Sequence, residues 1–341
     1  MTGYVFHPLY LEHTLVGHPE NHYRLLAIMD LLKKEGVLDR LKLIEPKPVP
    51  RELLQTVHAP RYIQLVEEMA KSGGGHLDLD TYMGPHSYDA ALMAAGGTVE
   101  AVRAVLDGEV ENAFALVRPP GHHATPMRGM GFCIFNNVAI AARYALGRKE
   151  VERVLIVDFD VHHGNGTQDI FYRDPSVLYF STHQYPHYPG TGYITDIGEG
   201  EGYGYTVNVP LRGWVGDEGF KAIFEEILVP IAQRYRPDLI LVSAGFDSHW
   251  ADPLASMLLS IRGYAELARI LKSLAEELCQ GRIVFVLEGG YKLEVLSHCV
   301  LNTFYILMGE EKVVDPLGPS PRPEQPVNAI IQNLKEIHKL V

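Results

Sequence analysis

Short apolar runs alternate with longer amphipathic segments along most of this chain. The short runs are rich in β-branched residues and have the length of buried strands; they lie at residues 113–117, 154–157, 177–180, 239–243 and 283–287. The longer segments repeat apolar residues every three or four positions, which predicts helices at residues 22–34, 87–106, 136–146, 217–234, 263–278, 293–308 and 328–340. This alternation is typical of β-α units around a mainly parallel central sheet flanked by helices.

A single α/β domain covering residues 1–341 is the expected organisation. The chain has 341 residues, 47% of them hydrophobic, which is enough for one sizeable core. No internal repeat or low-complexity block interrupts it. The Pro-rich stretch at residues 315–326 is expected to be a surface strap before the last helix, so that strap and helix occupy about 315–341.

The charge balance narrows the choice of partner. The formal net charge is −12, and no run of Lys and Arg is present that could track a phosphate backbone. Nucleic acid is therefore a poor candidate, whereas a cationic or amine-bearing ligand suits an acidic protein.

Cysteine usage and hydropathy indicate a cytoplasmic protein. Cys133, Cys279 and Cys299 show no CxxC spacing, so neither a disulfide framework nor a thiolate zinc site is indicated. The first ten residues lack a signal-peptide pattern, and no segment approaches the 18 uninterrupted apolar residues of a membrane span. We expect a soluble protein that is not exported; an oligomer is possible.

Polar or Gly-rich clusters follow all five predicted strands. Ligands bind just beyond the carboxyl ends of the strands in an open parallel sheet, so one site built from these clusters is expected. The clusters begin with Arg118-Pro119-Pro120-Gly121-His122-His123, Asp158-Phe159-Asp160-Val161-His162-His163, Ser181-Thr182-His183, Ala244-Gly245-Phe246-Asp247 and Glu288-Gly289-Gly290-Tyr291.

Asp160, His162 and Asp247 are the candidate metal ligands. Asp160 and His162 are two positions apart after a strand, so extended backbone projects both side chains to the same side, and Asp247 ends another strand. One imidazole and two carboxylates leave a coordination position open, which suits a catalytic zinc and also ferrous iron or cobalt. Such a metal supports amide or ester hydrolysis.

The remaining catalytic candidates are His122, His123 and Tyr291. Paired histidines beside a hydrolytic metal can supply a general base and a general acid. We expect Asp158 to hold His122 protonated, and Asn165 to leave His123 as the base. Tyr291 follows two glycines and could donate its phenol hydrogen to an oxyanion.

Two aromatic residues in Gly-flanked loops, Phe132 and Tyr188, could wall a narrow tunnel for an alkyl chain. Cys133 is expected to pack beside the site. Six histidines without a strong local partner are expected in loops or at the surface: His7, His13, His58, His76, His86 and His187.

These motifs together resemble the histone deacetylase family and its bacterial relatives, including the histone deacetylase-like and acetylpolyamine amidohydrolases. The resemblance runs from Gly17-His18-Pro19-Glu20 to the Tyr291 motif, and it includes Gly131-Phe132-Cys133-Ile134-Phe135-Asn136-Asn137. It implies the arginase/deacetylase α/β fold and one zinc ion on Asp160, His162 and Asp247. Asn165, where class I members carry Asp, is similar to the class II pattern.

The resemblance also implies further site residues. A monovalent cation, usually potassium, is expected near Asp158, Asp160, His162 and Ser181. The acyl-lysine tunnel is expected to include Gly131, Phe132, Tyr188 and Leu254, and Arg24 is expected to line an exit channel for the released acid. Because Tyr291 is retained, where the poorly active vertebrate class IIa members have His, an active enzyme is expected.

Acyl-lysine side chains of proteins or peptides are the expected substrates, with small acylated amines as the alternative. The polyamine-selective vertebrate member resembles this sequence around Asp252-Pro253-Leu254, except for a Glu in place of Leu254. A carboxylate there would attract the internal ammonium of an acetylpolyamine, whereas Leu254 offers apolar contact. Two other possibilities are a dimanganese ureohydrolase, which needs additional bridging carboxylates, and a non-catalytic acyl-lysine binding module.

Overall fold

A sheet of eight parallel strands forms the centre of the computed structural model, which describes residues 1–340. The order of its strands is β2-β1-β5-β10-β9-β6-β7-β8. A separate antiparallel pair, β3 and β4, lies outside it. The strands are β1 (Thr2–Val5), β2 (Lys42–Leu43), β3 (Gly75–His76), β4 (Tyr82–Met83), β5 (Asn112–Ala115), β6 (Val154–Asp158), β7 (Val177–Gln184), β8 (Thr206–Leu211), β9 (Leu239–Ala244) and β10 (Ile283–Leu287).

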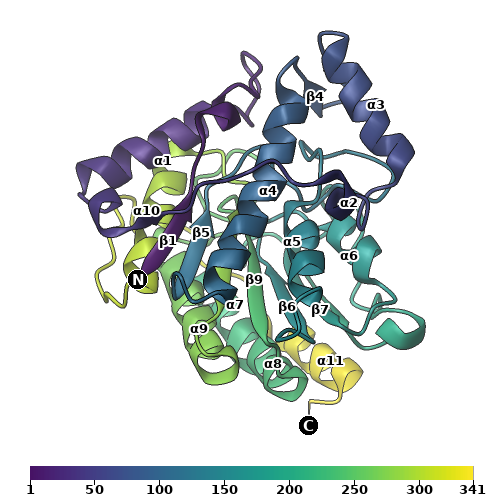
Figure 1. The fold of residues 1–341 in the computed structure, drawn as a ribbon. Coiled ribbons are helices and arrows are strands. Elements are labelled where there is room, and N and C mark those ends of the chain that lie inside the picture. The colour runs from purple at the N-terminus through teal and green to yellow at the C-terminus, as the bar shows by residue number, and fades with distance from the viewer. Residues whose placement is uncertain (341) are drawn as a thin grey trace.

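Helices cover both faces of the sheet (Figure 1). On one face α4 and α5 contact the central strands, and on the other face α9 and α10 do so, with α1 packed along α10. The α-helices are α1 (Tyr23–Lys34), α2 (Arg51–Leu54), α3 (Pro60–Lys71), α4 (Ser87–Leu106), α5 (Asn137–Leu146), α6 (Asn165–Phe171), α7 (Asp217–Ile223), α8 (Val229–Tyr235), α9 (Ile261–Cys279), α10 (Leu293–Leu307) and α11 (Asn328–His338). The predicted fold class, a mainly parallel sheet flanked by helices, is confirmed.

All five predicted strands are present, and the central ones are buried along their whole length. Burial on both faces explains why they stand out as continuous apolar runs. Besides the separate pair of β3 and β4, the prediction omitted β1, β2 and β8 of the central sheet. These strands lie at or next to the edges of the sheet, and β8 includes Asn208 and Pro210. Proline is tolerated at an edge because no neighbouring strand needs its missing N–H group.

The predicted helices are also present, with one interruption and small shifts at their ends. The segment predicted as one helix at 217–234 contains a π-helical turn, Phe224–Leu228, between α7 and α8. Pro230 follows this turn; because its ring removes a backbone N–H group, the regular hydrogen-bond ladder cannot pass through unchanged. Helices α2, α3 and α6 were not predicted. The final helix ends at His338, and Val341, the last residue of the predicted domain, lies outside the described residues.

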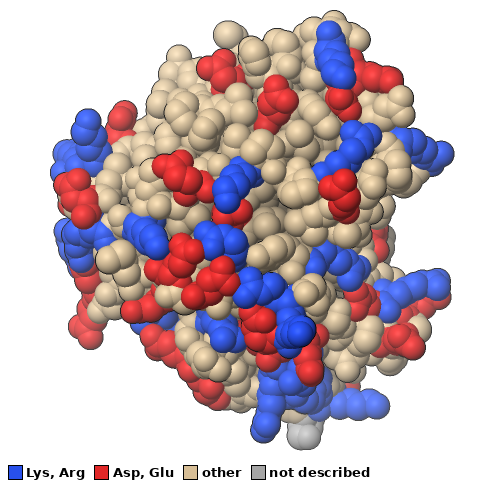
Figure 2. Space-filling model, viewed as in Figure 1, with Lys and Arg blue, Asp and Glu red and all other residues tan. Residues whose placement is uncertain are grey.

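Acidic and basic side chains are interspersed on the face shown in Figure 2, and its upper part is largely uncharged. No continuous basic stripe crosses this face. None of the helices in the described part of the chain combines the length and hydropathy needed to span a bilayer. The three cysteines are buried and unpaired with one another.

Candidate active site

The parallel register brings three strand ends into one row. Asp158 at the end of β6 is paired with Ser181 of β7 on one side and with Ser243 of β9 on the other. All three residues are fully buried. Because parallel strands end at a common edge, residues that are far apart in the sequence meet there. The next residues along each chain segment form the site.

Asp160, His162 and Asp247 meet beyond this row. Their potential ligand atoms all lie within 4.8 Å of one another, and the three residues are buried. His162 Nδ1 is 3.1 Å from Asp160 Oδ1 and 3.3 Å from Asp247 Oδ2. The structure therefore brings the three predicted ligands together, in an arrangement of one nitrogen and two carboxylate donors that suits zinc.

The other oxygens of these carboxylates are held by backbone N–H groups. Val161 N donates to Asp247 Oδ1 at 2.9 Å, and Gly289 N donates to Asp160 Oδ2 at 2.8 Å. Asp247 Oδ2 is buried but accepts no hydrogen bond in the described structure. Its near neighbour is His162 Nδ1 at 3.3 Å, and a cation held between this nitrogen and the carboxylate oxygens would compensate the buried charge. The residues present therefore fit a metal ion.

Glycine is required on two sides of the cluster. A Cβ atom at Gly245 would lie 2.0 Å from Asp160 Oδ2, and one at Gly289 would lie 2.3 Å from Asp247 Oδ2. Both distances are far below a normal contact. The two glycines therefore allow the backbone to approach the carboxylates closely, which any larger residue would prevent.

His122 and His123 lie side by side with different partners. His122 Nδ1 is 3.0 Å from Asp158 Oδ2, and His123 Nδ1 is 2.8 Å from Asn165 Oδ1. Asn165 is the first residue of α6, so the unpredicted helix fixes its position. The two contacts expected from the sequence are present, and their catalytic roles stay predictions.

These partners set the protonation of the two rings in opposite directions. Burial opposes a charge on His122, but the nearby carboxylates, Asp158 foremost, raise the pKa of His122 to about 10. Burial and the positive charges of the neighbouring imidazoles hold the pKa of His123 well below its usual range. These shifts favour a charged His122 and a neutral His123 at neutral pH.

The backbone of the histidine turn is fixed by a buried carboxylate that was not predicted to have a role. Glu288, after β10, accepts hydrogen bonds through Oε2 from Gly121 N at 2.7 Å and His122 N at 3.2 Å. Ser243 Oγ donates to its other oxygen. His122 and Glu288 also lie near Cys133 in a group with metal-ligand spacing. This group contains a single carboxylate, whereas a dimanganese ureohydrolase centre needs additional bridging carboxylates.

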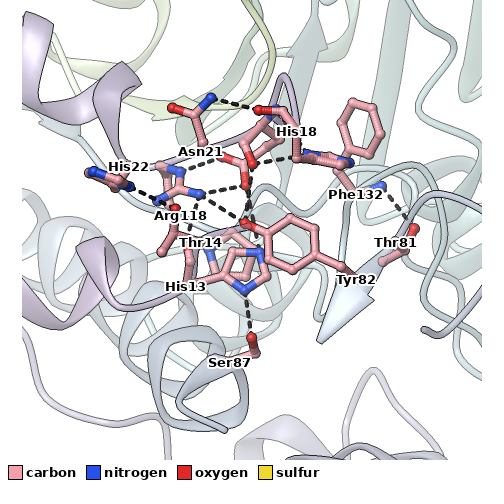
Figure 3. Close-up of polar contacts among 12 residues, drawn as sticks. His13, Thr14, His18, Asn21, His22, Thr81, Tyr82, Ser87, Arg118 and Phe132 are labelled. Carbon is pink, nitrogen blue, oxygen red and sulfur yellow. Dashed lines mark hydrogen bonds and ion pairs between the residues drawn. The ribbon is translucent and has the colours of Figure 1, made fainter. Parts of the chain in front are cut away.

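Arg118 begins the same turn and lies at the centre of a buried polar network (Figure 3). Its guanidinium donates to both carboxylate oxygens of Glu20 and to the backbone oxygens of Tyr10 and His13. Tyr82 donates from its hydroxyl to Glu20 O at 3.1 Å. The network ties the loop after the first strand to the turn that carries the two histidines.

Tyr291 and the glycine before it are held by Arg24. Arg24 Nε donates to Gly290 O at 2.8 Å, and its guanidinium carbon lies 5.1 Å from the centre of the Tyr291 ring. Gly290 has a φ of 113°, a backbone conformation that favours glycine. Burial raises the pKa of Tyr291, so the phenol keeps its proton at neutral pH. The exit-channel role of Arg24 stays a prediction.

The aromatic residues predicted for the tunnel contact both sides of the catalytic cluster. The Phe132 ring lies 5.8 Å from the Tyr291 ring, and the Tyr188 ring lies 5.2 Å from the His123 ring. Phe132 has a φ of 69° directly after Gly131, and its N–H group donates to Thr81 Oγ1 (Figure 3). Leu254 is partly buried. The substrate contacts of Gly131, Phe132, Tyr188 and Leu254 stay predictions.

Two of the histidines expected in loops or at the surface lie in loops but are buried. His13 stacks on Tyr82 with ring centres 4.3 Å apart, and its Nδ1 is 2.7 Å from Ser87 Oγ. His58 accepts a hydrogen bond from Asn136 N, and burial lowers the pKa of His58 to about 3. Their partners are remote in sequence, so inspection of neighbouring residues could not reveal them.

A buried group of one imidazole and two carboxylates, flanked by paired imidazoles and a phenol at the carboxyl ends of parallel strands, suits a metal-dependent hydrolase. Comparison with known proteins identifies which kind. A model of the histone deacetylase domain matches residues 18–307. The chain belongs to the histone deacetylase family, and it is an amide-hydrolysing deacetylase.

Individual relatives match most of the chain. A probable deacetylase of Archaeoglobus fulgidus is 48% identical over 297 residues, covering 86% of this chain and 82% of that protein. The human polyamine deacetylase HDAC10 is 39% identical over 329 residues, covering 93% of this chain and 48% of that protein. The crystal structure of the HDA15 HD domain is 36% identical, with a TM-score of 0.91 and coverage of 99% of this chain and 94% of that one.

The cluster geometry predicts the effect of removing one ligand. Losing a residue that hydrogen-bonds to a metal ligand typically weakens metal affinity roughly ten- to hundredfold. Asp247→Asn should weaken the affinity for a divalent metal by more than this, because it changes a ligand itself. Metal analysis after dialysis measures this. Asp217→Asn is a matched control, because Asp217 is a partly buried carboxylate that bonds Ser260 away from the cluster. Full metal retention in Asp247→Asn would remove Asp247 from the ligand set.

Proposed function

We propose that this protein hydrolyses the amide bond of acetyl-lysine or other short acyl-lysine side chains, using one zinc ion held by Asp160, His162 and Asp247. The observation that carries the proposal is the convergence of these three buried side chains, whose potential ligand atoms lie within 4.8 Å of one another while Asp247 Oδ2 accepts no hydrogen bond. When bound, zinc would polarise the amide carbonyl and lower the pKa of a water molecule. Potassium is proposed near Asp158, Asp160, His162 and Ser181, and the same metal analysis of the untreated protein tests both ions.

The two histidines take different proton-transfer roles in this proposal. His123, neutral and held by Asn165, accepts the proton of the attacking water and then passes it to the leaving amine. His122 stays protonated beside Asp158 and stabilises the negative charge that develops on the carbonyl oxygen. The proposal is supported by the opposite pKa shifts of the two rings.

Tyr291 completes the proposed chemistry by donating its phenol hydrogen to the same oxygen. Its neutral state supports this role, because only the protonated phenol is a donor. The products are a free amine and a carboxylate. The proposed setting is a reducing compartment such as the cytoplasm, which suits three buried and unpaired cysteines.

Adding a charge next to His123 should shift the pH dependence of the reaction. Asn165→Asp places a carboxylate at His123 Nδ1, which raises the pKa of His123. Because the base acts in its neutral form, the acidic limb of the kcat/KM profile should move to higher pH. A profile with an unmoved acidic limb would refute the assignment of His123 as the base.

Loss of the Tyr291 hydroxyl should affect turnover more than binding. Tyr291→Phe removes a donor that acts on the developing charge, so kcat should fall roughly a hundredfold or more with little change in KM. Steady-state kinetics with an acetyl-lysine peptide measures both constants. An unchanged kcat is the result that this role cannot accommodate.

The choice between acyl-lysine and acetylpolyamine substrates is proposed to depend on Leu254. The proposal rests on the apolar side chain of Leu254, since burying a polyamine's internal ammonium against it would leave that charge unpaired. Wild-type protein should therefore favour acetyl-lysine peptides over acetylspermidine in kcat/KM. Leu254→Glu should move this ratio toward acetylspermidine by roughly tenfold, which corresponds to about 1.4 kcal/mol. Preference of the wild type for acetylspermidine, or an unchanged ratio in the variant, would contradict the proposal.

A further inference from the structure

Asp252 is a buried carboxylate between the metal-ligand strand β9 and helix α9. It is 5% exposed, and its two oxygens bond to two different loops. Oδ1 accepts a hydrogen bond from Leu254 N in its own loop at 3.0 Å. Oδ2 accepts hydrogen bonds from Tyr291 N at 2.8 Å and Lys292 N at 3.3 Å. Among residues 1–340, no cationic side chain forms an ion pair with it, so the backbone N–H groups are its partners.

The peptide groups before Tyr291 have other anchors. Gly289 N donates to Asp160 Oδ2, Phe246 N donates to Gly289 O, and Arg24 holds Gly290 O. The N–H group of Tyr291 bonds to Asp252 in the described structure. Gly290 lies between the two sets of anchors with a φ of 113°. Because glycine allows many backbone conformations, the position of Tyr291 beyond it depends on later contacts: Arg24 and Phe132 contact its ring, and Asp252 holds its backbone.

We propose that Asp252 is a positioning residue that fixes the Tyr291 phenol relative to the metal cluster. It does so by holding the Tyr291 and Lys292 N–H groups on one oxygen, while its other oxygen holds the loop of Leu254. This inference rests on the proposed role of Tyr291. The Asp252 carboxylate thereby links the backbone of Tyr291, the proposed oxyanion donor, to the backbone of Leu254, the proposed substrate-selecting residue.

Asparagine is the substitution that separates these contacts. In Asp252→Asn the new side chain has one acceptor oxygen, and the local Leu254 N–H group is the partner that it retains in an Asx turn. The NH2 group of the introduced amide would then face the N–H groups of Tyr291 and Lys292, where donor meets donor. The Tyr291 backbone would lose its anchor while the side-chain volume stays almost constant.

The test is steady-state kinetics of Asp252→Asn on an acetyl-lysine peptide, with metal content and thermal unfolding measured on the same samples. We expect kcat to fall by roughly tenfold or more, because small displacements of a catalytic group are costly, with KM changed less than about twofold. Metal content should match the wild type. In the Tyr291→Phe background, Asp252→Asn should lower kcat little further, since the group that it positions is already absent.

Asp238→Asn is the matched control. Asp238 Oδ2 likewise accepts from two consecutive backbone N–H groups, Glu152 N at 2.8 Å and Arg153 N at 2.9 Å. It precedes β9, at the opposite end of that strand from the site, so its loss should leave kcat unchanged. If Asp252→Asn does not yield folded protein, Asp252→Ser replaces it, because a serine oxygen can reach the local Leu254 N–H group but not Tyr291 N.

Three results would overturn the inference. The first is a kcat of Asp252→Asn equal to that of Asp238→Asn, and the second is loss of the bound metal from Asp252→Asn. The third is a double variant in which the fold-losses of kcat from Asp252→Asn and Tyr291→Phe multiply fully. If Tyr291→Phe lowers kcat as expected while Asp252→Asn leaves kcat unchanged, this inference is refuted and the proposed role of Tyr291 is not. An unchanged kcat in Tyr291→Phe refutes the proposed role of Tyr291 and this inference with it.

Discussion

Several buried carboxylates lie where the parallel strands end, and each needs partners that compensate its negative charge. The rest of the site depends on this constraint. Asp158, Asp160, Asp247 and Glu288 are each at most 1% exposed. Burying ionised carboxylates is costly unless each oxygen has a partner, and most of these oxygens accept bonds from backbone N–H groups or imidazoles. Asp247 Oδ2 is the exception. The His162 imidazole lies close to this oxygen, at 3.3 Å, and a cation bound among the three residues would complete the compensation.

The same constraint explains why the surrounding backbone is so closely held. A carboxylate such as Glu288 or Asp252 reduces its own desolvation cost by accepting hydrogen bonds from a neighbouring loop, and it fixes that loop in return. The buried pair of Arg118 and Glu20 acts similarly on the loop that leads toward the site. Breaking such a pair by removing one partner leaves an isolated buried charge, a loss of about 3–5 kcal/mol in typical proteins.

The residues proposed for the chemistry and those proposed to select the substrate lie on different parts of the fold. The metal cluster and His122 follow central strands, whose positions are set by pairing on both sides. Leu254 and Tyr188 lie on longer loops beyond the C-terminal ends of the strands, and such loops can vary without disturbing the core. This separation is consistent with relatives that share the domain while one of them is named a polyamine deacetylase.

The sequence by itself determined the fold class, the five central strands and most helices, because burial imposes a regular spacing of apolar residues that can be read locally. It also brought Asp160 and His162 to one side of an extended segment, since that depends only on the geometry of neighbouring residues. The tertiary structure decided the order of the strands, the burial of His13 and His58, and the contacts of Glu288 and Asp252. Glu288 bonds a residue 167 positions away, and no local pattern specifies such a partner. Hydrogen bonds between distant segments form only where the packed sheet brings them together, which is why the chemistry was predictable and much of its support was not.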